Sequence, residues 1–336
     1  MLLKASILLL LLIPMLLPGQ RLERVRVVFY NAENLFDTRN DSLTIDDDFT
    51  PRGRQHWSRE RYTRKLLHLS KALIAVGEGD LPGIIGLSEV ENRSVLSDLV
   101  GKTGLSDGKY GIVHADSPDR RGIDVALLYR EDLFRVIHAC FFPVYLKTGE
   151  ATRDILYCEG IMGERDTIHF FVCHFPSMRG GEAKSEWKRV KAALVVRQKV
   201  DSIQASHSKA MIVIMGDLNG RADTPAQQAL KVRKPGDEGI EAGDLYNTGY
   251  YLLGKPRGSY RFRGEWQTLD HVIVSGSLLN GASGLRASRK MSVYDADFLL
   301  EEERGKFGVR PKPTYRGPRY IGGYSDHLPV FIDLEK

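Results

Sequence analysis

Six short segments place acidic, amide or imidazole side chains beside apolar runs. The residues are Asn31 and Glu33, Glu89 and Glu91, His174, Asp217 and Asn219, Asp270 and His271, and Asp326 and His327. Loops at strand ends are where sheet proteins place reactive groups. One such residue alone is typical of a turn or cap, but six segments of this composition favour a shared site. Oxygen-rich donor sets of this kind suit Mg²⁺, Mn²⁺ or Ca²⁺ rather than zinc.

The apolar runs that flank these residues predict the strands of a sheet protein, because they are short and rich in β-branched and aromatic residues. The four runs between residues 124 and 173 follow one another closely, which predicts an antiparallel meander. Residues 211–215 (MIVIM) are entirely apolar and predict a central strand. Expected strands cover residues 25–30, 84–88, 124–129, 134–142, 155–161, 168–173, 211–215, 272–274 and 329–332.

Helical spacing of apolar residues predicts helices between these strands. Residues 58–76 carry Tyr62, Leu66, Leu69 and Leu73 at helical spacing. Residues 94–100 and 181–206 show further helical patterns, and a fourth helix is expected with Thr224 as its N-cap and Pro225 at its first position. Strands that alternate with helices in each half predict a two-layer β-sandwich with helices outside, as one domain.

The composition is that of a globular protein, and it narrows the function only a little. Of 336 residues, 42% are hydrophobic and 27% charged, and the net charge is +5. This mild excess suits a polyanionic substrate without implying nucleic acid. Cys140, Cys158 and Cys173 are too few for a disulfide framework. We expect buried thiols, and a disulfide between two of them stays open.

The N-terminal segment has the pattern of a secretory signal peptide. Residues 1–20 (MLLKASILLLLLIPMLLPGQ) contain one lysine, an apolar core and a small residue near the expected cut. We therefore predict a signal peptide over 1–19 and a single domain over 20–336. The mature chain is expected to be secreted or periplasmic. It is expected to have no stable membrane span, because no later apolar run approaches about 18 residues.

Seven motifs in fixed order carry a resemblance to a known family. They are YNAENLFD at 30–37, GLSEVEN at 86–92, RGIDVALLY at 121–129, CHFPSMRGG at 173–181, GDLNGRADTP at 216–225, TLDHVIVS at 268–275 and YSDHLPV at 324–330. The chain resembles the endonuclease/exonuclease/phosphatase superfamily, which is deoxyribonuclease-I-like, and in particular a secreted bacterial branch. The resemblance implies an α+β, four-layer αββα sandwich, in which helices flank two packed mixed β-sheets.

The resemblance also implies a metal site. Glu89 would be the principal Mg²⁺ ligand, with Asn31 beside it and Asp326 nearby, directly or through water. Mn²⁺ or Ca²⁺ would also suit these oxygen donors. The number of metal ions stays open. Asp46, Asp47 and Asp48 form an acidic run that could hold a second cation or be a solvated loop.

Five further residues receive catalytic roles from the resemblance. His327 would act as the general base or bind the phosphate, and Asp270 would orient its ring. Asp217 would orient or deprotonate the attacking water, and Asn219 would hold a phosphate oxygen. His174 would face the scissile phosphate from the other side. The choice of base between Asp217 and His327 stays open. His271, at a position where the family often has Tyr, is expected to pack.

Basic and aromatic residues near the motifs are candidates for substrate contacts. Arg121, Arg179 and Tyr315 are the predicted substrate-binding residues, because Arg suits phosphate and aromatics can stack bases. The segment 305–323 reads as a long ordered loop or a substrate flap, and solvated basic surface is the alternative for its arginines. Further candidates are Arg153, Arg310, Arg316, Arg319 and Tyr320.

The leading hypothesis is a monomeric, divalent-metal-dependent phosphoesterase, in particular a secreted phosphodiesterase or nuclease acting on DNA or RNA by in-line attack of water on phosphorus. The alternative is a phosphomonoesterase or phospholipase-like hydrolase acting on sugar, inositol or lipid phosphates. A hypothesis of another class is a non-catalytic binding protein with the same fold. His174 argues against the abasic-site repair members of the family, which use tyrosine for this role. The presence of all the motif residues argues against the binding protein, because non-catalytic members of the superfamily usually lose some of them.

Overall fold

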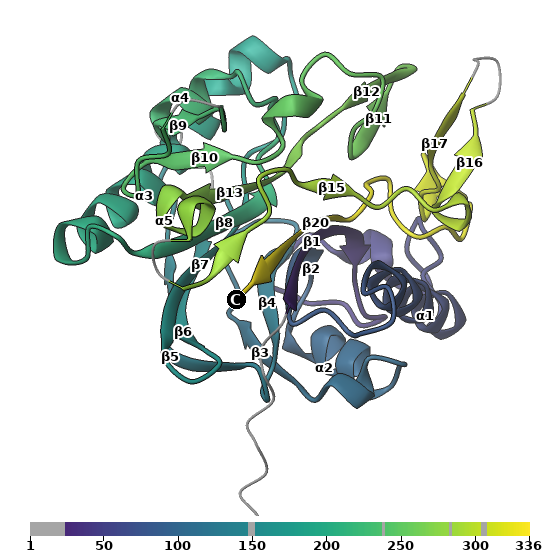
Figure 1. The fold of residues 1–336 in the computed structure, drawn as a ribbon. Coiled ribbons are helices and arrows are strands. Elements are labelled where there is room, and N and C mark those ends of the chain that lie inside the picture. Colours follow the sequence, from purple (N-terminus) through teal and green to yellow (C-terminus); the bar gives the residue numbers. More distant parts are fainter. Residues whose placement is uncertain (1–23, 147–151, 237–238, 282–283, 304–307) are drawn as a thin grey trace, which may run out of the picture.

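The computed structural model describes residues 24–146, 152–236, 239–281, 284–303 and 308–336. The predicted signal peptide, residues 1–19, lies outside the described residues. The described chain is built around two seven-stranded mixed sheets (Figure 1).

The first sheet has the order β14-β20-β1-β2-β4-β3, and β15 also pairs with β20. β1 and β2 are parallel, whereas β20 is antiparallel to β1 and β4 is antiparallel to β2. Its strands are β1 (Arg24–Leu35), β2 (Ile84–Val90), β3 (Tyr110–His114), β4 (Asp124–Arg130), β14 (Arg286–Ala287), β15 (Ser292–Val293) and β20 (Val330–Glu335).

The second sheet has the order β5-β6-β7-β8-β13-β10-β9. β7 and β8 at its centre are parallel, and β13 is antiparallel to β8. Its strands are β5 (Phe134–Phe142), β6 (Ile155–Met162), β7 (Asp166–His174), β8 (Met211–Asp217), β9 (Val232–Arg233), β10 (Leu245–Asn247) and β13 (Asp270–Ser275).

Helices cover the outer faces of the two sheets, α1 and α2 on the first and α3 and α4 on the second (Figure 1). This arrangement confirms the expected αββα sandwich. In α1, the Ser58 side chain accepts a hydrogen bond from Arg61 N at 3.3 Å, so the helix begins where predicted. The helices are α1 (Arg59–Val76), α2 (Arg93–Gly101), α3 (Glu182–Ser206), α4 (Pro225–Ala229) and α5 (Gly276–Asn280).

Short elements complete the fold. Three hairpins lie outside the main sheets: β11 (Tyr260–Phe262) with β12 (Glu265–Gln267), β16 (Leu300–Glu302) with β17 (Val309–Pro311), and β18 (Tyr315–Arg316) with β19 (Arg319–Tyr320). Single 3₁₀ turns are η1 (Asp47–Phe49), η2 (Ser106–Gly108), η3 (Tyr250–Leu252) and η4 (Asp297–Leu299).

Alternation along the strands divides the second sheet between two cores. In β7, Phe170 and Val172 belong to the core between the sheets, whereas Phe171 belongs to the core under α3. The sheets approach closely at Gly86, where a Cβ atom would lie only 2.8 Å from Met215 Sδ. A larger residue at 86 would therefore push apart the two sheets that carry the polar strand ends.

One sequence expectation about the strands is wrong. β4 does not join the predicted meander, because it pairs with β2 and β3 in the first sheet while β5, β6 and β7 form the antiparallel run in the second. The chain crosses between sheets at 131–133, and short sequence separation alone does not specify which sheet a strand joins. Thr224 is the N-cap residue of α4 and Pro225 is its first residue, as predicted. The Thr224 hydroxyl donates to Arg221 O at 3.0 Å and does not accept from a helical amide.

All three cysteines are free. Cys140 packs with the core under α3 and Cys158 lies in the core between the sheets, on the other face of the second sheet. Cys173 is fully buried. The expectation of buried thiols holds for Cys158 and Cys173, whereas Cys140 is only half-buried. In the part of the chain that the structure describes, no helix combines the length and apolarity that a membrane span needs.

Candidate active site

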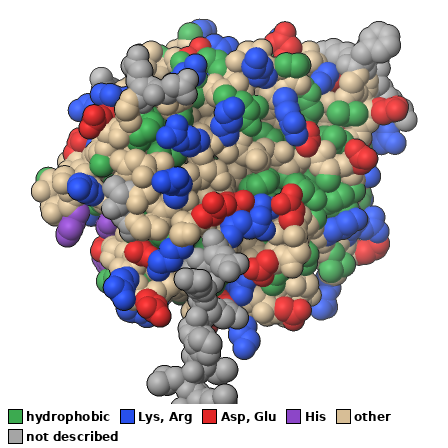
Figure 2. Space-filling view, viewed as in Figure 1, with side chains coloured by type: hydrophobic (Ala, Val, Ile, Leu, Met, Phe, Trp, Pro, Cys, Tyr) green, Lys and Arg blue, Asp and Glu red, His purple; other side chains and the backbone are tan. Residues whose placement is uncertain are grey.

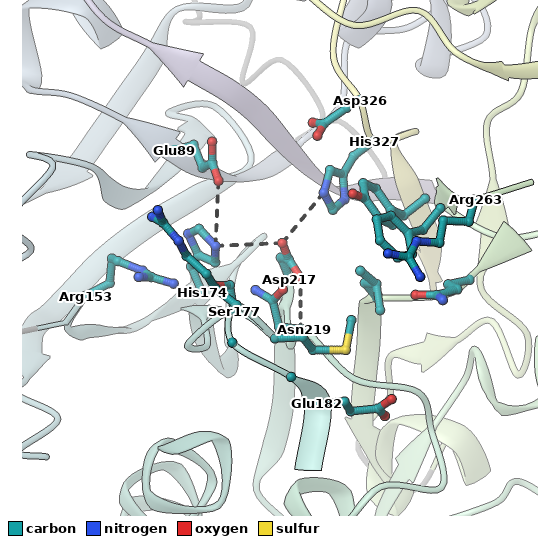
Figure 3. A pocket seen from close by; sticks show the side chains of 18 of the residues that line it. Glu89, Arg153, His174, Ser177, Glu182, Asp217, Asn219, Arg263, Asp326 and His327 are labelled. Atoms are coloured by element: carbon teal, nitrogen blue, oxygen red, sulfur yellow. Dashed lines mark hydrogen bonds and ion pairs between the residues drawn. The ribbon is translucent and has the colours of Figure 1, made fainter. Parts of the chain in front are cut away.

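The strand pairing itself brings three of the predicted catalytic residues together. His174 ends β7, Asp217 ends β8 and Asp270 begins β13. In the parallel register His174 pairs with Asp217, and in the antiparallel register Asp217 pairs with Asp270. The three side chains therefore stand at the same level of the second sheet. Figure 3 shows how Glu89 of the first sheet, and Asp326 and His327 shortly before β20, meet His174 and Asp217 across a pocket.

Asp217 lies at the centre of this group. Its Oδ2 atom accepts a hydrogen bond from Asn31 Nδ2 at 3.1 Å and lies 3.7 Å from His174 Nε2 and 3.8 Å from His327 Nε2. Its Oδ1 atom accepts from the backbone amide of Asn219 at 2.9 Å. Burial, followed by the charge of Asp270, raises the pKa of Asp217 to about 7. The carboxyl group is therefore able to exchange a proton near neutral pH.

His327 is held by a second carboxylate. Its Nδ1 atom lies 2.7 Å from Asp270 Oδ2, so its Nε2 atom faces Asp217. The ring of Tyr260 packs against it, with centroids 4.8 Å apart. Burial alone would lower the pKa of His327, but the charge and hydrogen bond of Asp270, with Asp217, raise it well above the usual value. This ring carries a positive charge at neutral pH.

His174 lies on the opposite side of Asp217 and is in the opposite state. Its Nε2 atom faces Glu89 Oε1 at 3.9 Å as well as Asp217, and its Nδ1 atom is buried without a hydrogen-bond partner. Burial, and then the nearby charges of Arg153 and Arg121, lower its pKa well below the usual value. The ring is therefore neutral at neutral pH. The two facing carboxylates favour the tautomer protonated at Nε2.

Glu89 sits in a strained turn at the end of β2. Its φ angle is +58°, in the left-handed region, and the β2–β4 register shifts at this point. Its Oε2 atom accepts from the backbone amide of Asn34 at 3.1 Å, and Asn34 is also left-handed. That bond leaves Oε1 directed at His174 and, at 4.0 Å, at the guanidinium of Arg121. Such strain at a strand end is typical of functional sites.

Asn31 and Asp326 complete the predicted metal-binding group. The amide of Asn31 links the sheets by its bond to Asp217, and its Oδ1 atom accepts from Glu33 N at 2.9 Å. Burial, and then the charge of Glu89, raise the pKa of Asp326. The half-buried carboxylates of Glu89 and Asp326 thus face one region with the buried carboxylate of Asp217, and these hard oxygen donors fit a divalent cation that would offset their repulsion.

A compact acidic and imidazole group, Asp217, Asp270 and His327, also has donor atoms within 4.8 Å of one another. We interpret this group as a hydrogen-bonded triad rather than a metal centre. The 2.7 Å contact already uses His327 Nδ1 and Asp270 Oδ2 with each other, and it is a short charge-assisted bond.

A buried lysine, Lys65, stabilises the segments that carry the site. It was not identified from the sequence as a residue of the site. Lys65 on α1 donates to Thr314 Oγ1 at 2.6 Å and to Tyr324 O at 2.7 Å, and its Nζ atom lies 3.8 Å from Glu33 Oε2. Glu33 in turn accepts from Thr314 N at 2.6 Å. These bonds tie the segment before Asp326 to β1 and α1. In the sequence, Lys65 follows Tyr62 by three residues, and this spacing places it on the apolar face of the helix.

The pocket has a volume of about 750 Å³ and contains most of the predicted residues. Arg121 and Arg179 line it, as predicted for substrate contacts, and so do Glu89, His174, Asp217, Asn219, Asp326 and His327. Asn31 and Asp270 lie directly behind Asp217 and His327, to which they are bonded. Lining residues that sequence reasoning missed come from the β11–β12 hairpin and its flanks: Tyr260, Phe262, Arg263 and Gln267.

Tyr315 lies elsewhere. Its ring packs against Phe49, Trp57 and Tyr320, and its hydroxyl donates to Gln55 O at 2.8 Å, so it belongs to an aromatic cluster beside α1. It is not among the residues that line the pocket. The described part of the predicted flap forms β17, β18 and β19. Arginine and aromatic residues in a loop do not reveal whether they face solvent, substrate or each other.

Other predicted residues prove to be structural or peripheral. Arg310 and Arg316 both pair with Glu301. Arg153 lines the pocket, but its guanidinium is buried and already donates to Asp119 and to Phe175 O. His271 is buried, with its Nε2 atom 2.8 Å from Gly220 O, as its expected packing role requires. Glu91 accepts from Asp37 N and does not line the pocket.

The comparisons agree with this architecture. The model of the Endonuclease/Exonuclease/phosphatase family matches residues 26–336. The chain belongs to this family. A comparison with curated protein sequences gives no significant match.

Solved structures with the same fold span nearly the whole chain. An endonuclease/exonuclease/phosphatase family protein from Bacteroides thetaiotaomicron has 16% identity and a TM-score of 0.56, covering 93% of this chain and 94% of its own. A mannosyl-6-phosphatase of the same organism has 15% identity and a TM-score of 0.53, covering 93% and 100%. D. rerio TDP2, complexed with single-strand DNA product, has 13% identity and a TM-score of 0.55, covering 93% and 99%. At these identities the likeness concerns the fold.

Proposed function

We propose that the protein is a divalent-metal-dependent phosphoesterase, and that its substrate is a phosphodiester of nucleic-acid type. The observation that carries this proposal is the position of two imidazoles on either side of Asp217, one charged and one neutral. Their Nε2 atoms lie 3.7 Å (His174) and 3.8 Å (His327) from the same carboxylate oxygen. A phosphoryl group between the two rings would meet a donor on each side and a proton acceptor at the centre.

Glu89, Asp326 and Asn31 would hold the metal ion, which we propose is Mg²⁺. When bound, Mg²⁺ supplies Lewis-acid stabilisation of charge on the phosphoryl oxygens. The crowding of carboxylates described above supports a cation here. Mn²⁺ would satisfy the same oxygen donors.

Asp217 would accept the proton of the attacking water. The bond to Asp270 keeps His327 charged, so that its Nε2–H donates rather than accepts. Asp217 is left as the acceptor that faces the pocket, and its pKa of about 7 suits that role. His327 would then stabilise the charge that develops on a phosphoryl oxygen.

His174 would act from the opposite side of the phosphate. Being neutral and protonated at Nε2, it would donate a hydrogen bond without adding a full charge to the pocket. Asn219 lines the same pocket, and its side-chain amide is oriented by a 2.9 Å bond to Phe175 O. Its remaining N–H would hold a second phosphoryl oxygen.

The lining of the pocket supports a phosphodiester with an attached base. Arg121 and Arg179 supply guanidinium groups, and Tyr260 and Phe262 supply rings on the β11–β12 side. Phe262 is about half exposed, and Arg263 lies 5.2 Å over its ring. Exposed aromatics beside a phosphate site suit stacking of a nucleobase.

A phosphomonoesterase acting on a sugar or inositol phosphate is the second candidate. The pocket volume of about 750 Å³ is in the usual range for small-molecule sites. Positive and negative side chains are interspersed over the face drawn in Figure 2, without a continuous basic stripe there.

The test is a panel of substrates with Mg²⁺ or Mn²⁺ and an EDTA control. Plasmid DNA and bis-p-nitrophenyl phosphate are run beside p-nitrophenyl phosphate and inositol phosphates. We expect metal-dependent nicking and diester hydrolysis. Phosphate release from monoesters with intact DNA would move the protein to the second candidate. Metal binding without turnover of any phosphoester would indicate a binding protein.

Export and a monomeric state are further proposals. The lysine, apolar core and Pro-Gly of residues 1–20 support export. Edman sequencing of the protein recovered outside the cytoplasm is expected to begin at or near residue 20, and an intact residue 1 would contradict cleavage. Light scattering of the purified protein is expected to give the mass of one chain.

A further inference from the structure

A second group of metal-type ligands lies outside the pocket. His114 ends β3, Asp124 begins β4, and Asp116 lies in the loop that joins them. One donor atom from each of the three side chains lies within 4.8 Å of the others. None of the three lines the pocket or has a part in the proposed reaction.

Asp124 is oriented so that one oxygen is left for a ligand. The backbone amide and the hydroxyl of Ser117 both donate to Asp124 Oδ1. The other oxygen, Oδ2, lies 3.3 Å from His114 Nε2. Hydrogen bonds that fix one carboxylate oxygen and present the other are typical of the residues that orient metal ligands.

Two buried polar atoms in this region make no hydrogen bond. The side chain of His114 is only 2% exposed, yet its Nε2 atom has no hydrogen-bond partner although it faces Asp124. Asp154, directly before β6, has a buried Oδ1 atom without a partner. Burial and the charge of Asp124 raise the pKa of Asp154. Buried polar atoms without partners are rare, and a bound cation would give His114 Nε2 a partner.

We propose that His114, Asp116 and Asp124 bind a Zn²⁺-type divalent ion, with Asp154 beside them. Donors at about 2.0–2.1 Å in tetrahedral geometry lie about 3.3 Å apart, which equals the separation of His114 Nε2 and Asp124 Oδ2. The imidazole nitrogen favours such a transition metal over Mg²⁺ or Ca²⁺. Because Asp116 is exposed, an ion can enter from its side. Its carboxylate would then complete the site.

The site would hold together the two strands of an edge hairpin. His114 and Asp124 belong to strands of the first sheet, whereas Asp154 leads into β6 of the second. An ion bound by His114 and Asp124 would fix the end of β3 to the start of β4. Its effect is expected on thermal stability, separately from phosphoester hydrolysis.

The experiment measures Zn²⁺ content after dialysis against Zn²⁺ and then against metal-free buffer. It uses Glu89→Gln as the background, so that the proposed catalytic metal site is weakened. We expect one Zn²⁺ per chain, a rise in Tm with Zn²⁺, and visible Co²⁺ absorption of tetrahedral type. Adding His114→Gln is expected to abolish all three, whereas the exposed His138→Gln is the matched control and is expected to leave them unchanged.

Asp116→Asn provides a second variant that should fold, because Asp116 is exposed. It is expected to raise the Kd for Zn²⁺ about tenfold or more. The proposal is overturned if the Glu89→Gln background retains no Zn²⁺. Zn²⁺ affinity that is unchanged by Asp116→Asn and by any folded His114→Gln protein would also overturn it, and His114–Asp124 would then be an ion pair only.

Discussion

His174 and His327 lie on two sides of the same carboxylate oxygen, at 3.7 and 3.8 Å from it, yet their pKa values move in opposite directions. Both rings are buried, so burial alone would leave both neutral. The difference between the two pKa values comes from the charged side chains that lie behind each ring. Asp270 bonds His327, whereas the charges beyond His174 are those of Arg153 and Arg121. The carboxylate of Asp217 thus lies between a charged ring, His327, and a neutral ring, His174.

The largest effect is expected from removing the shared acid. Asp217→Asn keeps the shape but removes the proton acceptor and one charge that stabilises the His327 imidazolium. We expect kcat/KM for a phosphodiester to fall about 10³–10⁴-fold. The pKa of His327 should fall as well, as followed by NMR titration of its ring. Retention of more than a tenth of the activity would show that Asp217 is not the base.

Asp270→Asn is expected to change the charge of His327 but not that of His174. The variant removes the charge that keeps His327 protonated, so that ring should titrate at lower pH while His174 stays neutral. Activity is expected to fall about 10²-fold or more, since the charged donor is lost. A ring of His327 that stays charged at the same pH in this variant would contradict the role of Asp270.

Arg121→Gln tests the other side with a smaller effect. Its guanidinium lies 4.0 Å from Glu89 Oε1, and its charge helps to keep His174 neutral. We expect KM for the phosphodiester to rise about tenfold with a smaller change in kcat, because a phosphate contact is lost. The pKa of His174 should rise. Equal kinetics for Arg121→Gln and the wild type would remove Arg121 from the substrate site.

The fourth prediction concerns pH and metal together. Burial raises the pKa of Asp217 from 3.8 to about 7 and that of Glu33 from 4.5 to about 7. Between about pH 4 and 7 the folded state therefore binds more protons than the unfolded chain, and these two groups make stability fall as pH rises. Mg²⁺ and protons compete for the carboxylates of the site. Mg²⁺ should therefore raise Tm by a few degrees at pH 8, where these groups are ionised, and by less at pH 5. An equal rise at both pH values would contradict this account.

The sequence predicted the elements better than their arrangement. Asp217 and His174 were identifiable because each follows an apolar strand, and strand register then brings them together. The sheet to which β4 belongs was not predictable from local pattern, because its pairing with β2 joins segments that α2 and β3 separate in the chain. The sandwich with helices outside was predicted from the alternation of strands and helices, and the family motifs implied the same architecture.

The charge states at the site were also beyond sequence reasoning. The direction in which each histidine titrates depends on burial and on which distant charge lies behind it, and neither is a property of the local motif. Lys65 and Tyr315 show the same limit in opposite ways. Lys65 sits buried under the site although it resembles a surface lysine of α1, and Tyr315 packs into a cluster although it lies in a basic loop.

The most direct test of the central claim is Mg²⁺-dependent hydrolysis of bis-p-nitrophenyl phosphate by a matched pair of variants. Glu89→Gln removes a carboxylate that faces the pocket, and Glu91→Gln removes one two residues away that does not line it. We predict that Glu89→Gln loses at least about 10²-fold in kcat/KM, while folded Glu91→Gln stays within a few-fold of the wild type. Equal activity of the two variants, or activity that persists in EDTA, would contradict the account.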